Sequence, residues 1–349
     1  MKTEHILIIR FSALGDIAMT VPVVYALAKE YPDVRVTMLS QPFARPLFED
    51  LAPNVSFMGA DIKEEYKGIK GLNALYRRLT AKNFTAVADL HNVLRSSYLR
   101  MRFNLDQNHV AHINKHREER RELTSQKNKV LRQLPTSFEN YAEVFARLGY
   151  PIHHFDFTSI FTPPQDSLRQ LPAAIGDKKD FQQWIGIAPF AAHQGKAYPL
   201  RLLEMVIEGI VKRHPSCRVF LFGGGDKERE LLDDIVKKHE RCTNVAATLH
   251  GLHEELVLMS HLDVMVSMDS ANMHLASLVG TTVVSIWGAT HPYAGFMGWQ
   301  QREDNAVQVA MPCRPCSIFG NKPCFREDYA CLYDITPEAI INKVEENLK

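Results

Sequence analysis

The sequence predicts an α/β protein built from two doubly wound, Rossmann-like domains that face each other across a cleft. Three observations lead to this prediction. Strand-like and helix-like segments alternate in each half of the chain, and a proline-containing stretch interrupts the alternation near the middle. The length of 349 residues and the hydrophobic content of 46% allow two domains of ordinary size, each with its own core.

The first half begins with a β-branched run and continues with apolar residues at helical spacing. His5–Arg10 is the predicted strand and Ile17–Tyr31 the predicted helix. Pro22 is tolerable near the start of that helix, because the first N–H groups of a helix lack intrahelical partners. Further strands are expected at Val34–Ser40, Val55–Gly59, Phe84–Leu90 and His109–Ile113. Such alternation is typical of a parallel sheet covered by helices.

The alternation fails between residues 162 and 175, where prolines and polar residues indicate a linker. We therefore predict a first domain at residues 1–165 and a second at residues 166–349. The second domain is expected to contain strands at Trp184–Ala188, Arg218–Phe222, Val264–Ser267 and Thr282–Trp287, and helices at Leu200–Arg213, Asp226–His239, Leu252–Ser260, Asn272–Val279 and Thr336–Leu348. The closing helix, residues 336–349, could pack back on the first domain.

Composition and charge argue against several classes of protein. The net charge of +1 argues against a strongly basic nucleic-acid-binding protein, so no nucleic-acid partner is expected. No apolar run reaches the roughly 18–20 residues that a membrane span requires. The start of the chain leads directly into a predicted strand without a signal-peptide pattern. We therefore expect a cytoplasmic protein.

Four of the six cysteines gather near the C-terminal end with the spacing C-x2-C-x7-C-x6-C; they are Cys313, Cys316, Cys324 and Cys331. In a reducing compartment such a cluster more often binds a metal than forms disulfides. The later two cysteines lack the C-x2-C spacing of a second zinc knuckle. A structural zinc site, free thiols and a redox-sensitive loop are therefore alternative interpretations.

The strongest signal for a binding site follows the predicted strand at Val264–Ser267. Asp269, Ser270 and Ala271 lead into a predicted helix, and His274 lies a few residues further along it. The free N–H groups and the dipole at the start of a helix favour an anion, most often phosphate. In the alternative interpretation, Asp269 or Ser270 only caps the helix and His274 is a core residue.

Three further loops follow predicted strands and carry residues suited to catalysis or binding. Asp16 lies beside a glycine at a predicted helix start, where it is either a positioned carboxylate or a simple cap. Lys196 follows another strand and could neutralise a diphosphate or be merely solvated. Gly223 and Gly224 either allow close approach of a ligand or form a tight turn. These loops contain neither a dinucleotide fingerprint nor a P-loop motif.

In order and spacing, these four loops resemble those of glycosyltransferase family 9, the heptosyltransferases of lipopolysaccharide core synthesis. The matching motifs are Arg-x-Ser-x-x-Gly-Asp, Gly-Lys-x-Tyr-Pro, Phe-Gly-Gly-Gly-Asp, and Asp-Ser-x-x-x-His-Leu-Ala followed by Trp-Gly-Ala-Thr-x-Pro. The cysteine cluster and the Ile-Thr-Pro-Glu helix start look like the C-terminal end of the family. The resemblance covers nearly the whole chain, although Ala271 stands where the family usually has glycine.

The resemblance implies a GT-B fold and inverting transfer of a sugar from a nucleotide-diphosphate donor, typically ADP-heptose, without a cofactor. Asp16 matches the proposed general base of the family, and Lys196 matches the lysine that meets the donor phosphates. The donor-binding loop corresponds to Asp269, Ser270 and His274. The chain contains no D-x-D triplet, so we expect no catalytic metal.

The acceptor implied by the resemblance is an anionic, lipid-linked glycan at the inner face of the inner membrane, where the protein would be peripheral. Basic residues gather between residues 95 and 132, and we select Arg95, Arg120 and Arg121 as acceptor-binding candidates. A solvated helical face is the alternative for these arginines. The alternative functions are a nucleotide-sugar epimerase, a non-catalytic nucleotide- or glycan-binding protein, and a zinc-stabilised interaction protein.

Overall fold

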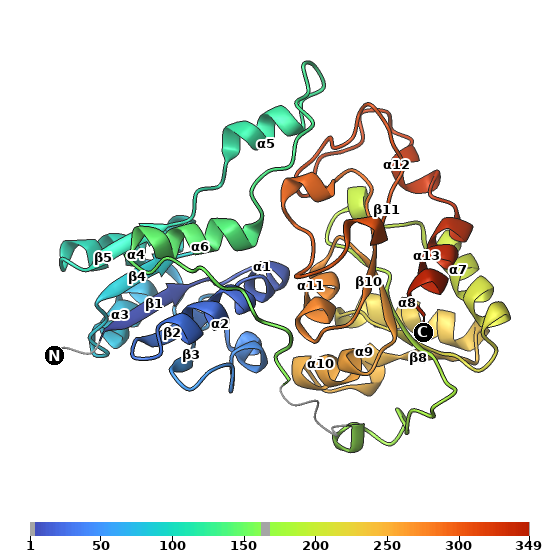
Figure 1. Ribbon diagram of the computed structural model, residues 1–349, viewed down its shortest axis with the longest axis horizontal. Helices are drawn as coiled ribbons and strands as arrows, with labels where there is room; N and C mark the ends of the chain where they lie inside the picture. The colour runs from blue at the N-terminus through green and yellow to red at the C-terminus, as the bar shows by residue number, and fades with distance from the viewer. Residues whose placement is uncertain (1–3, 162–167, 349) are drawn as a thin grey trace. The chain divides into compact units, whose positions relative to one another are not determined.

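The computed structural model describes residues 4–161 and 168–348, which form two compact units (Figure 1). Unit 1 consists of Met1–Lys115 and Pro135–Ile160, and unit 2 consists of His116–Leu134 and Phe161–Lys349. Each unit contains one parallel sheet with helices packed on it. The predicted α/β fold with two parallel-sheet domains is therefore confirmed. Part of the predicted linker, residues 162–167, lies outside the described residues.

Unit 1 has a five-stranded parallel sheet in the order β3-β2-β1-β4-β5. The strands are β1 (His5–Ile9), β2 (Arg35–Ser40), β3 (Val55–Gly59), β4 (Ala86–Asp89) and β5 (His109–His112). The strand order reverses direction between β1 and β4, and all five residues of β1 are buried. In a doubly wound sheet, the carboxyl ends of the strands at this reversal are the usual place for a ligand.

The helices of unit 1 are α1 (Leu14–Ala18), α2 (Val21–Glu30), α3 (Gly68–Thr80), α4 (Leu94–Leu105) and α6 (Ser137–Arg147), with a 3-10 turn at Pro42–Leu47. The single helix predicted at Ile17–Tyr31 is wrong, because the structure has two helices there. Pro22 is the second residue of α2 and has no N–H to donate to the preceding turn, so α1 ends and a new helix begins.

The segment His116–Leu134, which includes α5 (Arg117–Leu123), belongs to unit 2 although unit 1 residues flank it on both sides. The Leu134 N–H donates to the carbonyl of Tyr293 over 2.9 Å. The ammonium of Lys129 donates to the carbonyls of Cys313 and Pro315, both over 2.8 Å. Residues 116–134 therefore do not belong to the first domain that we predicted at residues 1–165. Neighbouring positions along the chain do not determine on which core a segment packs.

Unit 2 has a six-stranded parallel sheet in the order β11-β10-β9-β6-β7-β8. The strands are β6 (Trp184–Ala188), β7 (Arg218–Leu221), β8 (Cys242–Asn244), β9 (Val264–Met268), β10 (Val283–Ile286) and β11 (Ala306–Val307). Here the strand order reverses direction between β6 and β9. The carboxyl ends of these two strands are therefore the expected ligand position in unit 2.

The longer helices of unit 2 are α7 (Leu200–Arg213), α8 (Gly225–Lys238), α10 (Leu252–Ser260), α11 (Ala271–Leu278) and α13 (Pro337–Asn347). Shorter helical turns lie at Leu168–Gln170, Gln194–Lys196, Val245–Thr248 (α9), Pro292–Ala294, Glu303–Asn305 and Ala330–Tyr333 (α12). Within the residues that the structure describes, no helix combines the length and the apolar character needed to cross a bilayer.

The closing helix α13 buries its apolar face within unit 2. Ile340, Ile341 and Val344 share a core cluster with the apolar residues of α7, and the two helices pack directly together. Arg213 at the end of α7 pairs with Glu338 of α13 at 2.7 Å. Helix α13 therefore packs on α7 and on the sheet of unit 2, and the packing of residues 336–349 on the first domain stays a prediction.

Candidate active site

Asp16 lies at the carboxyl end of β1 in unit 1, in the first turn of α1. Its Oδ2 accepts a hydrogen bond from the Ala13 N–H (3.1 Å) and pairs with the Arg10 guanidinium at 2.6 Å. Arg10 is itself buried and donates to the Leu90 carbonyl over 2.6 Å. The Asp16 side chain nevertheless keeps 32% of its surface exposed. The carboxylate is therefore held in one orientation and still accessible to a substrate hydroxyl.

His91 follows β4, the strand next to β1, and lies beside the same loop. Its Nε2 is 3.3 Å from the Ser12 hydroxyl, and the Phe11 N–H donates to its Nδ1 over 3.5 Å. Burial, with the nearby Arg10 and Lys115 cations, lowers the pKa of His91 to about 4. His91 is thus neutral at neutral pH. Asp89 at the same edge is buried and paired with Arg100 at 2.8 Å, so Asp16 is the accessible carboxylate of the two. Arg10 is the arginine of the Arg-x-Ser-x-x-Gly-Asp motif, but we did not predict that it orients Asp16, and no local pattern marks His91.

In unit 2, Lys196 and Asp269 meet at the reversal between β6 and β9. Lys196 ends the 3-10 turn that follows β6, Asp269 directly follows β9, and their charged groups are 3.3 Å apart. The Lys196 side chain is 15% exposed and that of Asp269 is 5% exposed. Among the described residues, Oδ2 of Asp269 has no well-aligned hydrogen bond, so Lys196 is its charge partner through the ion pair alone. The two predicted residues are therefore together in space.

The N-terminus of α11 lies at the same edge. Ser270 is the N-cap residue with extended backbone, but its side chain contacts the Ser267 hydroxyl (3.2 Å) instead of capping the helix. Ala271 is the first helical residue, and His274 is buried within the first turns. Because the N–H groups of the first turn have no intrahelical acceptors, they can bind an anion next to the Lys196 ammonium. This geometry favours the anion-site interpretation over simple capping by Ser270.

Gly223 and Gly224 follow β7, which neighbours β6 on the other side. A Cβ on Gly223 would lie 3.1 Å from Leu232 and 3.2 Å from Phe190, so this position is closely packed. A Cβ on Gly224 would meet nothing within 4 Å, and its N–H donates to the Glu228 carboxylate over 2.8 Å. Both predicted glycines thus lie at the carboxyl edge of the sheet. Gly223 packs closely against Leu232 and Phe190, and Gly224 is the N-cap residue of α8.

A loop near the C-terminal end holds Lys196 in place, which we did not predict. A Cβ on Gly320 would lie only 2.4 Å from Cγ of Lys196, and Gly320 has a φ of +72°. The Ala289 N–H donates to the Gly195 carbonyl over 2.7 Å, so the loop after β10 fixes the residue before the lysine. Gly320 and Ala289 are therefore positioning residues for Lys196. A glycine next to a cysteine cluster gives no local signal of this kind.

If Lys196 meets the donor phosphates, as the family resemblance implies, Gly320→Ala is expected to weaken nucleotide binding by about tenfold, because the methyl group displaces the lysine stem and a side chain is strained at positive φ. Calorimetric titration with ADP measures this. The matched control is Gly149→Ala, which has a φ of +92° and no atom within 4 Å of the new Cβ. If both variants bind ADP as the parent protein does, Gly320 has no role in positioning Lys196.

Comparison with known proteins shows the family to which the chain belongs. The model of glycosyltransferase family 9 (heptosyltransferase) matches residues 72–323. The chain belongs to glycosyltransferase family 9. It is 24% identical over 352 residues to lipopolysaccharide heptosyltransferase 1 of Campylobacter coli, covering 98% of both chains. The resemblance predicted from the motifs is confirmed, and this family 9 protein is a glycosyltransferase of the lipopolysaccharide heptosyltransferase type.

Solved structures agree on the fold. A family 9 glycosyltransferase from Veillonella parvula superimposes with a TM-score of 0.74 at 19% identity, covering 99% of this chain and 98% of the other. The Escherichia coli heptosyltransferase WaaC with ADP-2-deoxy-2-fluoro heptose gives a TM-score of 0.68 at 18% identity, covering 98% and 99%. The predicted GT-B fold class of this family 9 glycosyltransferase is confirmed.

The predicted acceptor arginines of this family 9 glycosyltransferase are divided between the two units. Arg95 is exposed on α4 in unit 1, whereas Arg120 and Arg121 are on α5, which belongs to unit 2. The Arg120 guanidinium lies over the rings of Phe296 (5.2 Å) and Phe319 (5.9 Å). Arg121 lines a small pocket with residues of the C-terminal loop. No single unit therefore carries all three arginines, and their common role stays a prediction.

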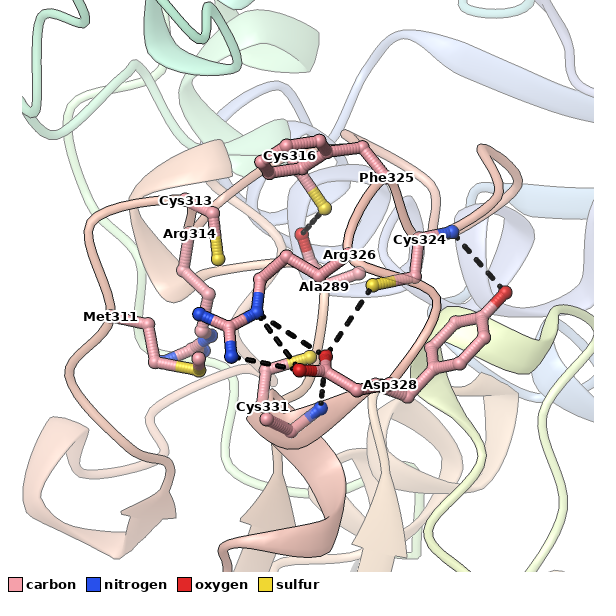
Figure 2. Close-up of a pocket in the computed structure, with 12 residues that line it drawn as sticks. Ala289, Met311, Cys313, Arg314, Cys316, Cys324, Phe325, Arg326, Asp328 and Cys331 are labelled. Carbon is pink, nitrogen blue, oxygen red and sulfur yellow. Dashed lines mark hydrogen bonds and ion pairs between the residues drawn. The ribbon is translucent and has the colours of Figure 1, made fainter.

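The four clustered cysteines line one pocket of unit 2, as Figure 2 shows. All are free thiols, and burial raises the pKa of Cys331 to about 11. Across residues 4–161 and 168–348, no three His, Cys, Asp or Glu side chains are placed so that they could hold a metal ion. The Cys316 N–H donates to the Ala289 carbonyl over 3.0 Å. The cluster thus supports the loop that fixes Gly195 and Lys196.

Proposed function

We propose that the protein transfers a heptose from ADP-heptose to the lipopolysaccharide core or a related lipid-linked glycan, with inversion and without a metal ion. This proposal rests on the functional groups that lie at the carboxyl edge of each sheet. The reversal in unit 1 holds an accessible carboxylate, and the reversal in unit 2 holds an ammonium beside a helix N-terminus that Ser270 does not cap. Base and anion site are the two groups that a direct displacement at an anomeric carbon requires.

In the proposed reaction, the Asp16 carboxylate accepts the proton of the acceptor hydroxyl. The acceptor oxygen then forms a bond to the anomeric carbon, while the bond from that carbon to the diphosphate oxygen breaks and ADP leaves. A single displacement of this kind inverts the anomeric configuration. Because Arg10 holds the carboxylate at 2.6 Å, its orientation is set before the acceptor arrives.

Unit 2 is proposed to stabilise the leaving diphosphate. Its negative charge grows as the bond to the sugar breaks, so fixed positive groups lower the barrier. Lys196 supplies a full charge, and the first N–H groups of α11 supply partial charges beside it. Relatives support adenine and heptose in the donor, because solved structures of WaaC contain ADP and ADP-2-deoxy-2-fluoro heptose.

The test is a thermal-shift and calorimetric screen of the full chain with ADP, UDP, GDP and CDP in the presence of EDTA. We expect ADP to raise the Tm and to bind with an affinity that EDTA does not change, since the proposed anion site uses only protein groups. Stabilisation by another nucleotide would contradict the ADP-heptose donor. Loss of binding in EDTA would contradict metal independence, and no binding at all would remove the donor-site assignment.

A transfer assay with ADP-heptose separates this function from that of a nucleotide-sugar epimerase. A transferase consumes the donor at a substantial rate only when an acceptor glycan is present, whereas an epimerase converts the donor alone. We propose that the acceptor is anionic and lipid-linked and is bound with help from Arg95, Arg120 and Arg121. The protein would then work as a peripheral enzyme on the cytoplasmic face of the inner membrane.

A further inference from the structure

One surface of unit 1 combines exposed apolar side chains with an excess of positive charge, on helices α3 and α4. Leu94, Tyr98, Met101 and Leu105 recur at intervals of four, three and four residues, so they lie along one face of α4. Leu94 is 92% exposed, Met101 50% and Leu105 70%. The opposite face of α4 packs into the core through Leu99 and Phe103. The exposed stripe is therefore not needed to fold unit 1.

Helix α3 extends this surface. The Asn73 side chain on α3 accepts hydrogen bonds from the Tyr98 hydroxyl (2.7 Å) and the Arg102 guanidinium (2.6 Å) of α4, so the two helices are fixed side by side. Ile69 on α3 is 69% exposed and lines a shallow pocket with Lys70, Asn73, Arg77 and Arg102. Apolar and basic groups of both helices thus form one continuous surface, which we call the α3–α4 face.

The charge of the α3–α4 face is one-sided. The two helices carry the cations Lys70, Arg77, Arg78, Arg95, Arg100 and Arg102 and contain no Asp or Glu. The whole chain has a net charge of only +1, so this density is local. Arg100 is engaged with Asp89 at 2.8 Å, and Asp106 just after α4 is engaged by the Tyr76 hydroxyl. Asp106 also interacts with Arg102, whereas Lys70, Arg77, Arg78 and Arg95 have no carboxylate on either helix to neutralise them.

We propose that the α3–α4 face docks on an anionic phospholipid bilayer. Exposed apolar side chains ringed by Lys and Arg are what a helix surface needs to enter the interface of such a membrane, and a protein partner of ordinary composition would leave this charge unmatched. In a parallel sheet, the helices α3 and α4 begin at the carboxyl edge. Leu94 and Ile69 therefore lie near the end of unit 1 that carries Asp16, where a lipid-linked acceptor would have to emerge.

This inference extends the proposed function, since a lipid-linked acceptor would bring the enzyme to a membrane, but its test uses neither donor nor acceptor. The full chain is sedimented with vesicles of phosphatidylcholine alone or with about 30% phosphatidylglycerol, a content that gives the surface a negative potential. We expect binding only to the anionic vesicles, and loss of binding at about 0.5 M salt because the attraction is screened.

Two double variants test the face itself. Lys70→Gln/Arg77→Gln is expected to lower partitioning about 30-fold, the effect of removing two charges at an anionic surface. Met101→Gln/Leu105→Gln is expected to lower it as well, by removing the apolar contact. Arg201→Gln/Lys212→Gln on α7 removes the same charge from unit 2 and should bind as the parent protein does. All the substituted residues are exposed, so we expect the variants to fold. A Tm equal to that of the parent protein shows that they do.

Several results would overturn the proposal. The parent protein could fail to bind anionic vesicles, or both α3–α4 variants could bind as well as the parent. Binding that appears only when a lipid-linked acceptor is added to neutral vesicles would assign the surface to the acceptor instead of the bilayer. A failure of sugar transfer with normal vesicle binding would contradict the proposed function and leave the docking surface intact, so the two can be told apart.

Discussion

Replacement of Asp16 by asparagine is expected to lower turnover at least about 100-fold, the usual scale for loss of a general base. Asparagine can still accept the Ala13 N–H but cannot take the proton of the acceptor hydroxyl. Nucleotide binding should stay unchanged, because Asp16 lies in unit 1 and the proposed anion site lies in unit 2. Turnover is measured in the transfer assay and ADP affinity by calorimetry on the same preparations.

Asp16→Asn also removes the charge partner of buried Arg10, so a stability control is required. Asp16→Glu keeps the charge and the ion pair but shifts the carboxylate by one methylene, and we expect it to lose activity while retaining its Tm. Asp33→Asn, at an exposed turn, should behave as the parent protein does. Near-normal turnover of Asp16→Asn would remove Asp16 from the role of base.

Replacement of Lys196 by methionine is expected to raise the Kd for ADP about 10- to 100-fold, the scale of a lost hydrogen bond to a charged group. Methionine keeps the length of the side chain, so the packing against Gly320 is retained. The substitution also leaves the Asp269 carboxylate buried without a counter-charge, and we expect the Tm to fall by about 5 °C or more. Calorimetry and thermal unfolding measure the two effects separately.

A second variant distinguishes ligand binding from stability. In Lys196→Met/Asp269→Asn neither charge is present, so the Tm should recover while ADP affinity stays low. Recovery of both would show that Lys196 acts only by neutralising Asp269. Lys212→Ala, an exposed lysine on α7, is the control and should change neither quantity.

Local patterns were sufficient to predict most strands and the edge of each sheet at which polar residues lie. The helix α10, for example, spans the predicted Leu252–Ser260, and the predicted strand Trp184–Ala188 is β6. Asp16, Lys196 and Asp269 were found for the same reason. Each follows a buried apolar run, and parallel strands bring their carboxyl ends to one edge.

The helices between residues 60 and 150 were not predicted. Helix α3 has its buried residues Leu72, Leu75, Tyr76 and Leu79 at helical spacing and was overlooked. In α4, basic residues and exposed apolar residues interrupt the pattern of burial, so the apolar spacing does not show a single buried face. The same residues form part of the α3–α4 face. A surface that departs from the usual polar exterior is therefore also a place where the sequence is harder to interpret.

What the sequence by itself determined was the two-domain α/β architecture and the family, and it also supplied the candidate side chains for the base and the phosphate ligand, whose roles stay predictions. Short-range periodicity and motif spacing carry that information, because they depend only on which residues are buried and how a strand passes into a helix. Tertiary structure alone decided that Arg10 orients Asp16, that Gly320 packs against Lys196, and that His116–Leu134 joins unit 2. These are contacts between distant segments, and periodicity reports that a face is buried without saying what covers it.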